Sequence, residues 1–248
     1  MSTRIKAILR VFGAVIALSS LIILPSLILA IIWSEPTVAP FAEAMLAPLI
    51  IGSLLWFVFR ENRYELRLRD GFLITGGIWF IASLVTAIPF YMALPKLSFT
   101  DAVFESVSGL TTTGATMFVG LDVMPKSLLF FRSSLSFFGG MGIVILAVAV
   151  LPMLKIGGMQ LFKAESTGPV KDNKLTPRIA ETARTLWFVY LGLNIICAIA
   201  YWLGGMTFFD AVTHAMTTVA TAGFSTHDAS FAFWDSPMLD GIAVVFML

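Results

Sequence analysis

Long apolar runs, separated by short polar stretches, follow one another along the whole chain. An α-helix of about 20 apolar residues is long enough to cross the hydrocarbon core of a bilayer. The first run is too long for a secretory signal and lacks a small-residue cleavage site near its end, so we expect it to be a retained helix, kinked at Pro25. The pattern predicts an all-α integral membrane protein with spans at Ile5–Trp33, Val38–Phe59, Gly71–Leu94, Ser127–Leu154 and Leu186–Leu203.

Two segments between these spans repeat each other without a gap, 109 positions apart (residue 208 against residue 99). The first copy is Phe99–Thr116 and the second is Phe208–Ser225. Both begin with a short helical pattern and both end in a tail rich in Thr, Ala and Gly. The identical pairs are Phe99/Phe208, Asp101/Asp210, Ala102/Ala211, Val103/Val212, Thr112/Thr221 and Gly114/Gly223.

Each copy opens on a helix-capping pattern, Ser98-x-x-Asp101 in the first and Thr207-x-x-Asp210 in the second. The hydroxyl can accept a hydrogen bond from a free backbone N–H, and the acid can reach back and complement the helix dipole. A helix over Phe99–Leu110 would be about 18 Å long, which is roughly half of the hydrocarbon thickness. The pattern therefore predicts two re-entrant half-helices.

A glycine follows each half-helix, Gly114 in the first copy and Gly223 in the second. Non-helical backbone at membrane depth must line a cavity, because its polar groups cannot face lipid. Carbonyl and hydroxyl oxygens at successive levels can replace the hydration shell of a monovalent cation. The alternative is a pair of ordinary extracellular turns. Two capped, gap-free copies favour pore loops, to which hydroxyls are added by Thr111, Thr112, Thr113, Thr116, Thr221 and Ser225.

The repeat extends to the flanking spans, since a Trp-Phe pair precedes each copy at a similar distance (Trp79 and Trp187). We predict four regions: a two-helix extension at 1–70, a first helix–pore-loop–helix unit at 71–154, a basic loop at 155–178 and a second unit at 179–248. The repeat offset aligns Leu248 with Gly139, so the second unit is expected to be truncated. On this interpretation the chain is an amino-terminal fragment or a truncated gene product, which would not conduct ions alone.

Composition and charge agree with a membrane protein. Hydrophobic residues make up 58% of the chain and charged residues 12%, against about 25% charged in an average soluble domain. The net charge of +1 gives no support for a nucleic-acid partner. Most of the 16 Lys and Arg residues lie before the first span, between the second and third, and between the fourth and fifth. The positive-inside rule therefore predicts a cytoplasmic N-terminus and pore loops that enter from outside.

Little in the chain favours an enzyme. The single cysteine, Cys197, lies within an apolar run, and the two histidines, His214 and His227, have no metal-ligand spacing. The spans contain neither paired carboxylates nor a nucleophile with a neighbouring base. We expect no enzymatic activity and no cofactor.

Three segments carry a resemblance to a known family. They are Thr-Thr-Thr-Gly-Ala-Thr at 111–116, the Gly-Gly-Met-Gly stretch that begins 139–152 and ends in Leu-Pro, and Thr-Ala-Gly-Phe-Ser-Thr at 221–226. These segments closely resemble the Trk-type potassium uptake proteins, the TrkH/TrkG branch of the Trk/Ktr/HKT superfamily. One departure is Phe137-Phe138, where many relatives have Gln-Trp.

The resemblance implies potassium uptake through a multi-pass protein of the bacterial cytoplasmic (inner) membrane, with four pore units in one polypeptide. It also implies a cytoplasmic nucleotide-binding regulatory subunit similar to TrkA and a homodimer of the full-length protein. Transport could be channel-like or a coupled symport. Glycine at position 114, where some sodium-preferring relatives have serine, favours potassium. Potassium is assigned to Thr112, Thr113, Thr221 and Ala222, within a selectivity filter made by Thr111, Thr112, Thr113, Gly114, Ala115, Ala220, Thr221, Ala222, Gly223 and Phe224.

A few further residues have more than one interpretation. Arg132 could place a charge near the pore mouth, but snorkelling to the outer interface is the favoured reading. Glu105 could add negative potential at the entrance, although a packing or hydrogen-bonding role is at least as well supported. The glycines at 139, 140 and 142 permit close helix packing or local unwinding, and unwinding would let this span act as a gate.

Two alternative functions stay open. The chain could be a non-conducting truncated or regulatory membrane subunit, or part of a transporter that passes both sodium and potassium. The basic loop between Lys155 and Arg184 is either solvated positive-inside charge or, by the resemblance, a docking surface for the regulatory subunit.

Overall fold

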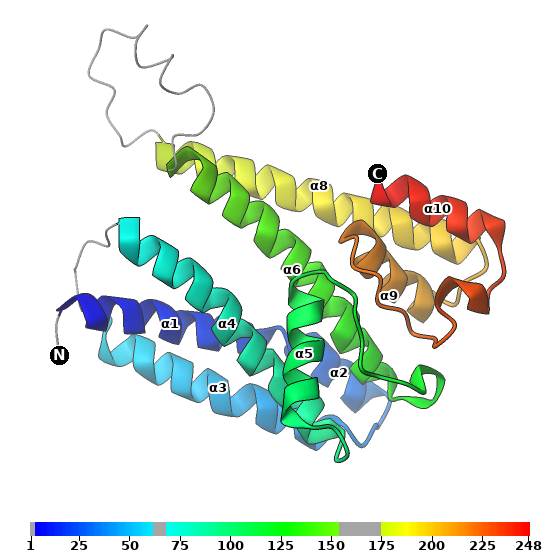
Figure 1. Ribbon diagram of the computed structural model, residues 1–248, viewed down its shortest axis with the longest axis horizontal. Helices are drawn as coiled ribbons and strands as arrows, with labels where there is room; N and C mark the ends of the chain where they lie inside the picture. The colour runs from blue at the N-terminus through cyan, green and yellow to red at the C-terminus, as the bar shows by residue number, and fades with distance from the viewer. Residues whose placement is uncertain (1–2, 62–67, 154–174) are drawn as a thin grey trace, which may run out of the picture.

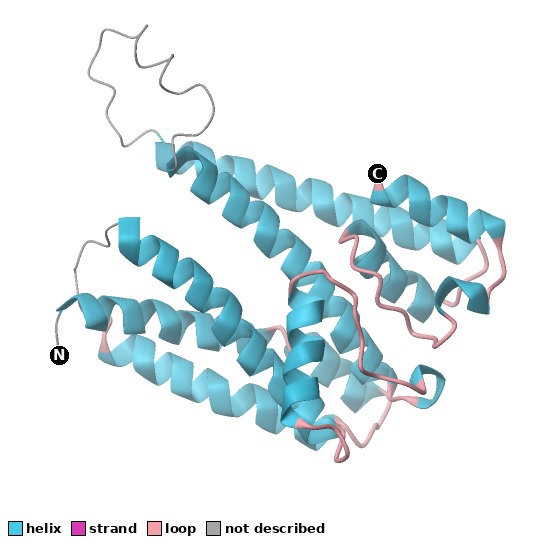
Figure 2. Cartoon of the chain, viewed as in Figure 1, coloured by secondary structure: helices cyan, strands magenta, loops and turns pink. Residues whose placement is uncertain are grey.

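The computed structural model describes residues 3–61, 68–153 and 175–248. This part of the chain consists of helices joined by loops, and Figure 2 shows no strand within it. In chain order the elements are α1 (Thr3–Leu21), α2 (Leu24–Ile32), α3 (Val38–Val58), α4 (Leu68–Ala93), α5 (Phe99–Leu110), the 3₁₀ turn η1 (Leu121–Val123), α6 (Lys126–Met153), α8 (Leu175–Leu203), α9 (Phe208–Val219), the 3₁₀ turn η3 (Ser230–Phe233) and α10 (Pro237–Met247).

The predicted spans are all present as helices. Four helical stretches in the described part are long and apolar enough to cross a membrane: residues 3–32, 38–58, 70–93 and 181–203. The remaining predicted span, Ser127–Leu154, is α6, which is 28 residues long. Within the first span the chain breaks between α1 and α2, because Pro25 in the first turn of α2 has no N–H to continue the ladder. The kink expected at Pro25 is therefore a break between two separate helices, α1 and α2.

Helices α1, α3 and α4 pack together at the N-terminal end of the fold. The approach of α1 to α3 is close enough to exclude side chains: a Cβ added at Gly13 would lie 2.8 Å from the Gly52 carbonyl oxygen. Small residues commonly allow such backbone contacts between membrane helices. The outer face of α3 exposes Ile50, Leu54 and Phe57, as a lipid-facing helix requires.

Helix α6 joins the two parts of the molecule. Figure 1 shows it running from the α1–α5 group toward the start of α8, and it contacts α2, α5, α8 and α9. On one side, the Phe131 ring of α6 packs edge-on against Phe41, and its centre lies 5.0 Å from that of Phe90. These rings belong to one hydrophobic core. A second core, around Tyr201 and Leu239, joins α8, α9 and α10. The two short helices α5 and α9 are thus held on either side of α6.

Candidate functional site

Both predicted half-helices start at the predicted cap. The Ser98 hydroxyl oxygen accepts a hydrogen bond from the Asp101 N–H (3.1 Å), and the Thr207 hydroxyl oxygen accepts one from the Asp210 N–H (3.2 Å). Each cap hydroxyl also donates to the carboxylate of the same aspartate, at 2.7 and 2.6 Å. The carboxylate thus accepts the hydrogen bond that the cap hydroxyl donates. A negative charge is fixed at the positive end of each helix dipole.

The two half-helices also end in the same way. The N–H of Thr113 bonds to the Ser108 carbonyl (2.8 Å), and the N–H of Thr112 bonds to the Gly109 carbonyl (3.0 Å). This pair of bonds is the Schellman arrangement of a helix C-terminus. In the second copy the corresponding bonds, from Ala222 to Thr217 and from Thr221 to Thr218, measure 2.8 and 2.9 Å.

The residue that turns the chain is a threonine in both copies. Thr112 has φ of 55° and Thr221 has φ of 52°, in the left-handed region that β-branched residues rarely adopt. Such a conformation costs roughly 1–2 kcal/mol. Two residues later the glycines also have positive φ, 76° at Gly114 and 100° at Gly223. Unusual backbone geometry of this kind is concentrated at functional sites, and here it occurs at equivalent positions of both repeats.

The two loops lie against each other. A Cβ added at Gly114 would lie 1.7 Å from the Ala222 carbonyl oxygen and 3.3 Å from the Gly223 Cα. The first loop can therefore approach the second only because residue 114 has no side chain. At Gly223 an added Cβ would meet nothing within 4 Å, so the second glycine is constrained by its backbone angle alone.

The candidate filter residues differ in exposure and in bonding. Thr111, Thr113 and Ala115 are exposed, whereas Ala220, Ala222 and Phe224 are buried. Thr111 and Thr113 of the first loop align with Ala220 and Ala222 of the second. At these two positions only the first loop has side-chain hydroxyls. There the Thr111 hydroxyl donates to the Val107 carbonyl (2.7 Å) and lies 2.8 Å from the Thr113 hydroxyl.

One candidate carbonyl is already engaged within the second copy. The Thr217 hydroxyl donates to the Phe224 carbonyl at 2.9 Å. The equivalent hydroxyl in the first copy, on Ser108, is buried without a hydrogen-bond partner in the described part of the chain. Potassium binding by the ten candidate residues stays a prediction.

Arg132 is buried behind the loops, so the snorkelling interpretation was wrong. Its side chain is 1% exposed, and its Nε donates to Glu105 at 2.7 Å. Glu105, itself fully buried, also accepts from the Thr116 hydroxyl (2.9 Å) and the Met117 N–H (3.0 Å). The hydrogen-bonding role predicted for Glu105 is confirmed. Helix α5, the loop after it and α6 are thereby joined.

A histidine supports the second loop at the position equivalent to Glu105. His214, the counterpart of Glu105, lies 2.9 Å from the Asp210 carbonyl through Nδ1 and 3.0 Å from the Ser225 hydroxyl through Nε2. Its ring packs edge-on against Phe231 and Trp234. In each copy the loop hydroxyl, Thr116 or Ser225, then accepts from the N–H two residues later. The same loop shape is therefore stabilised by two different sets of side chains.

The three candidate gating glycines lie on a continuous part of α6. A Cβ at Gly139 would lie 2.0 Å from the Leu110 carbonyl oxygen, so α6 contacts the last turn of α5 through backbone atoms. A Cβ at Gly140 would come within 3.2 Å of Ala220 at the end of α9. Gly142 is less crowded, with Trp79 at 3.6 Å. Close packing is what these glycines provide here, and a gating movement stays a prediction.

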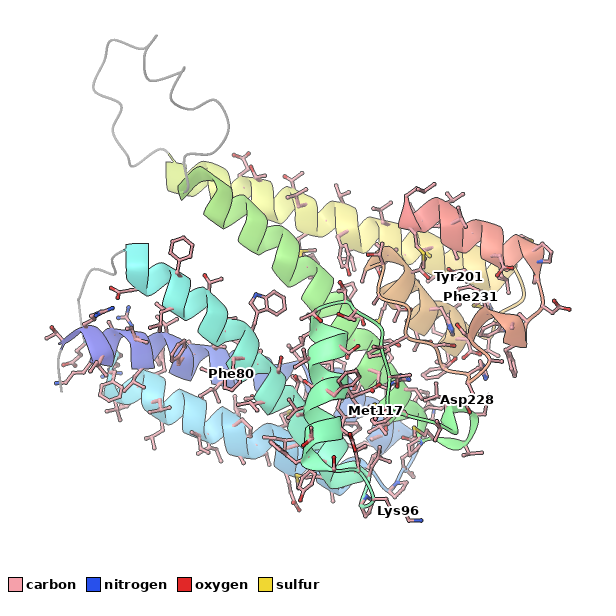
Figure 3. The ribbon with its side chains drawn as sticks, viewed as in Figure 1. Phe80, Lys96, Met117, Tyr201, Asp228 and Phe231 are labelled. Carbon is pink, nitrogen blue, oxygen red and sulfur yellow. The ribbon has the colours of Figure 1, made fainter. Side chains whose placement is uncertain are left out.

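Beyond the loops, the two repeats are joined by acidic side chains that the sequence analysis did not single out. Asp228 accepts from the N–H groups of Gly120 (3.0 Å) and Leu121 (3.1 Å), and Figure 3 shows it beside the loop that carries η1. Asp122 accepts from the His227 ring, which lowers the pKa of this carboxyl. Part of the basic loop, residues 154–174, lies outside the described residues.

The sequence model of the TrkH family, described as a cation transport protein, matches residues 39–248. The TrkH potassium uptake proteins of Vibrio parahaemolyticus and Escherichia coli K12 are 50% and 49% identical to the chain. Each alignment covers 98% of this chain and 50% of the relative. The TrkG protein of Escherichia coli K12 is 40% identical over the whole chain and 51% of its own length.

A crystal structure of the potassium transporter TrkH from Vibrio parahaemolyticus is similar to this structure, with a TM-score of 0.85 at 45% identity. The match covers 98% of this chain and 48% of the crystallised one, so the chain spans about half the length of the relatives it matches. The family match over most of the chain and the identity to several members agree with the paired, capped loops. The chain belongs to the TrkH family of cation transport proteins.

Proposed function

We propose that this chain supplies two of the pore loops of a potassium uptake protein, about half of its potassium pathway. The observation that carries the proposal is the backbone conformation that the two loops share: a Schellman helix end, a left-handed threonine and a positive-φ glycine, 109 residues apart. Matched strained backbones in contact with each other fit a filter in which several copies surround one ion.

The electrostatics of the loops support a monovalent cation. The C-termini of α5 and α9, where the helix dipoles are negative, lead directly into the loops. The buried carboxylate of Glu105 is paired with Arg132, so the loops present oxygen dipoles and no unpaired fixed charge. A cation can therefore be attracted without being held too tightly to leave.

The remaining features of the proposal come from the residue pattern and the family. The Lys/Arg distribution supports a cytoplasmic N-terminus. The bacterial relatives support location in the inner membrane. Glycine rather than serine at position 114 supports a preference for potassium over sodium. By family resemblance, the partners are a TrkA-like nucleotide-binding regulatory subunit and a second copy of the full-length protein.

The experiment compares glycines with the same backbone angle inside and outside the loops. Gly223 and Gly205 have φ of 100° and 106°, and an added Cβ meets nothing within 4 Å at either. The backbone strain from alanine is therefore similar at both positions. We expect Gly223→Ala to lower potassium uptake by at least about tenfold, because the carbonyls that replace the hydration shell lose their orientation, and Gly205→Ala to leave it unchanged.

Uptake is measured with the natural full-length protein in bacteria that have no other potassium uptake system, with membrane insertion checked for each variant. Gly114→Ala should also abolish uptake, with less folded protein, since its Cβ would overlap the Ala222 carbonyl. Equal uptake by the Gly223→Ala and Gly205→Ala variants would contradict the proposal.

A further inference from the structure

We propose that Arg132 is a positioning residue that fixes the second pore loop against the first and so sets ion selectivity. The inference rests on the proposed potassium pathway and adds a specific cause for the relative placement of its two loops.

The guanidinium of Arg132 binds equivalent positions of both repeats. Its Nη2 donates to the Thr116 hydroxyl at 3.0 Å, and its Nη1 donates to the Ser225 carbonyl at 3.1 Å. Thr116 and Ser225 each lie two residues beyond the glycine of their own loop. A single rigid side chain therefore sets the distance between the two loops immediately beyond the filter.

The rest of the guanidinium is held by fixed partners. Nε donates to Glu105, and Cζ lies 4.4 Å from the Phe224 ring centre and 5.3 Å from the Phe118 ring centre. Planar guanidinium groups form several hydrogen bonds in fixed directions and pack on aromatic faces, which an ammonium group cannot reproduce. The contacts with Glu105 and Phe224 thus fix the direction in which the guanidinium points at the Ser225 carbonyl.

A paired exchange between the repeats supports this role. The repeat offset places Gly241 at the position of Arg132 and His214 at the position of Glu105. The cation and its carboxylate are therefore both absent from the second repeat, where His214 bonds to Ser225 within its own copy. The Arg132–Glu105 pair is therefore present only in the first repeat, whose arginine reaches across to the other loop.

The test separates positioning from simple stabilisation. Arg132→Met with Glu105→Gln removes both buried charges at similar volume, a replacement that folded proteins often tolerate. This double variant leaves the Ser225 carbonyl without its donor. We expect normal insertion and a monodisperse elution profile, with discrimination of potassium over sodium reduced by about tenfold, the effect expected from losing one charge-assisted hydrogen bond.

Selectivity is measured as competition by sodium for potassium uptake by the natural full-length protein. Arg60→Met is the matched control, because Arg60 is exposed just after α3 and packs over Phe57 away from the loops. A folded double variant with unchanged selectivity would overturn the inference.

If the double variant does not fold, Arg132→Lys decides the question, since it keeps the charge beside Glu105 but cannot bind all three acceptors. Reduced discrimination in the lysine variant supports the inference, and wild-type discrimination overturns it. Absence of potassium uptake in the unaltered protein would instead contradict the proposed function itself.

Discussion

The loops that follow α5 and α9 have similar backbone conformations and different supporting side chains. In the first repeat, a buried Glu105–Arg132 pair holds the loop through Thr116. In the second, His214 holds Ser225, and aromatic rings from the η3 region surround the imidazole. Loop shape is determined mainly by backbone features common to both copies, namely the caps, the Schellman ends and the positive-φ residues.

The difference between the supports shows where the molecule allows sequence change. Side chains behind the loop have been exchanged together, Glu with His and Arg with Gly, while the turning threonine and the glycine are the same in both copies. The Glu105–Arg132 pair tolerates single substitutions less well than the His214 support, since a buried charge is stable only while its partner is present.

The largest expected contrast is between Arg132 and its counterpart Gly241. Arg132→Gln leaves the Glu105 carboxylate buried and unpaired, which we expect to lower the free energy of unfolding by about 3–5 kcal/mol. Gly241→Ala should raise it by up to about 1 kcal/mol, because an added Cβ meets nothing within 4 Å and alanine favours the helix α10. Unfolding of the purified protein in detergent measures both.

The control for this contrast is Glu105→Gln in the Arg132→Gln background, which removes the unpaired charge and should recover much of the loss. Similar stability of the Arg132→Gln and Gly241→Ala variants would show that the two repeats are supported more alike than the contacts indicate.

A smaller effect is expected where the repeats meet beyond the loops. The hydrogen bond from His227 lowers the pKa of Asp122. A carboxyl whose pKa is lowered by folding stabilises the folded state at every pH above its pKa in the unfolded chain, which is about 3.9. This contribution is lost as the pH falls from there through the pKa of the folded state.

Asp122→Asn should therefore slightly lower the melting temperature at pH 6–7, and the difference from wild type should vanish as the pH falls below about 4. Asp235→Asn is a suitable control because Asp235 is exposed and asparagine tolerates its φ of 45°. Equal melting temperatures of the Asp122→Asn variant and the wild type at pH 6–7 would show that the link between Asp122 and His227 does not stabilise the fold.

The sequence predicted the helical elements well because their signals are local. The capping residues and the glycine-rich tail predicted Phe99–Leu110, and the structure has the helix at these bounds. The internal repeat transferred the same prediction to α9. The left-handed φ of Thr112 and Thr221 had no such signal, since β-branched residues rarely adopt it.

The role of Arg132 could not be deduced from its position within a span. Its partners lie 27 residues away at Glu105 and 93 away at Ser225, and they depend on how α5 and the second loop pack on α6. A usable signal was nevertheless present: the repeat offset changes Glu105 to His214 and Arg132 to Gly241 together, as expected of a pair in contact.

The most direct test of the paired-filter account is the position of bound ions. Crystals of the natural full-length protein grown with rubidium, a potassium substitute, would show the ion by its anomalous scattering. We expect rubidium beside the backbone oxygens of residues 112–114 and 221–223, at the contact between Gly114 and Ala222. Rubidium bound elsewhere in a protein that transports it, with none at these two loops, would contradict the account.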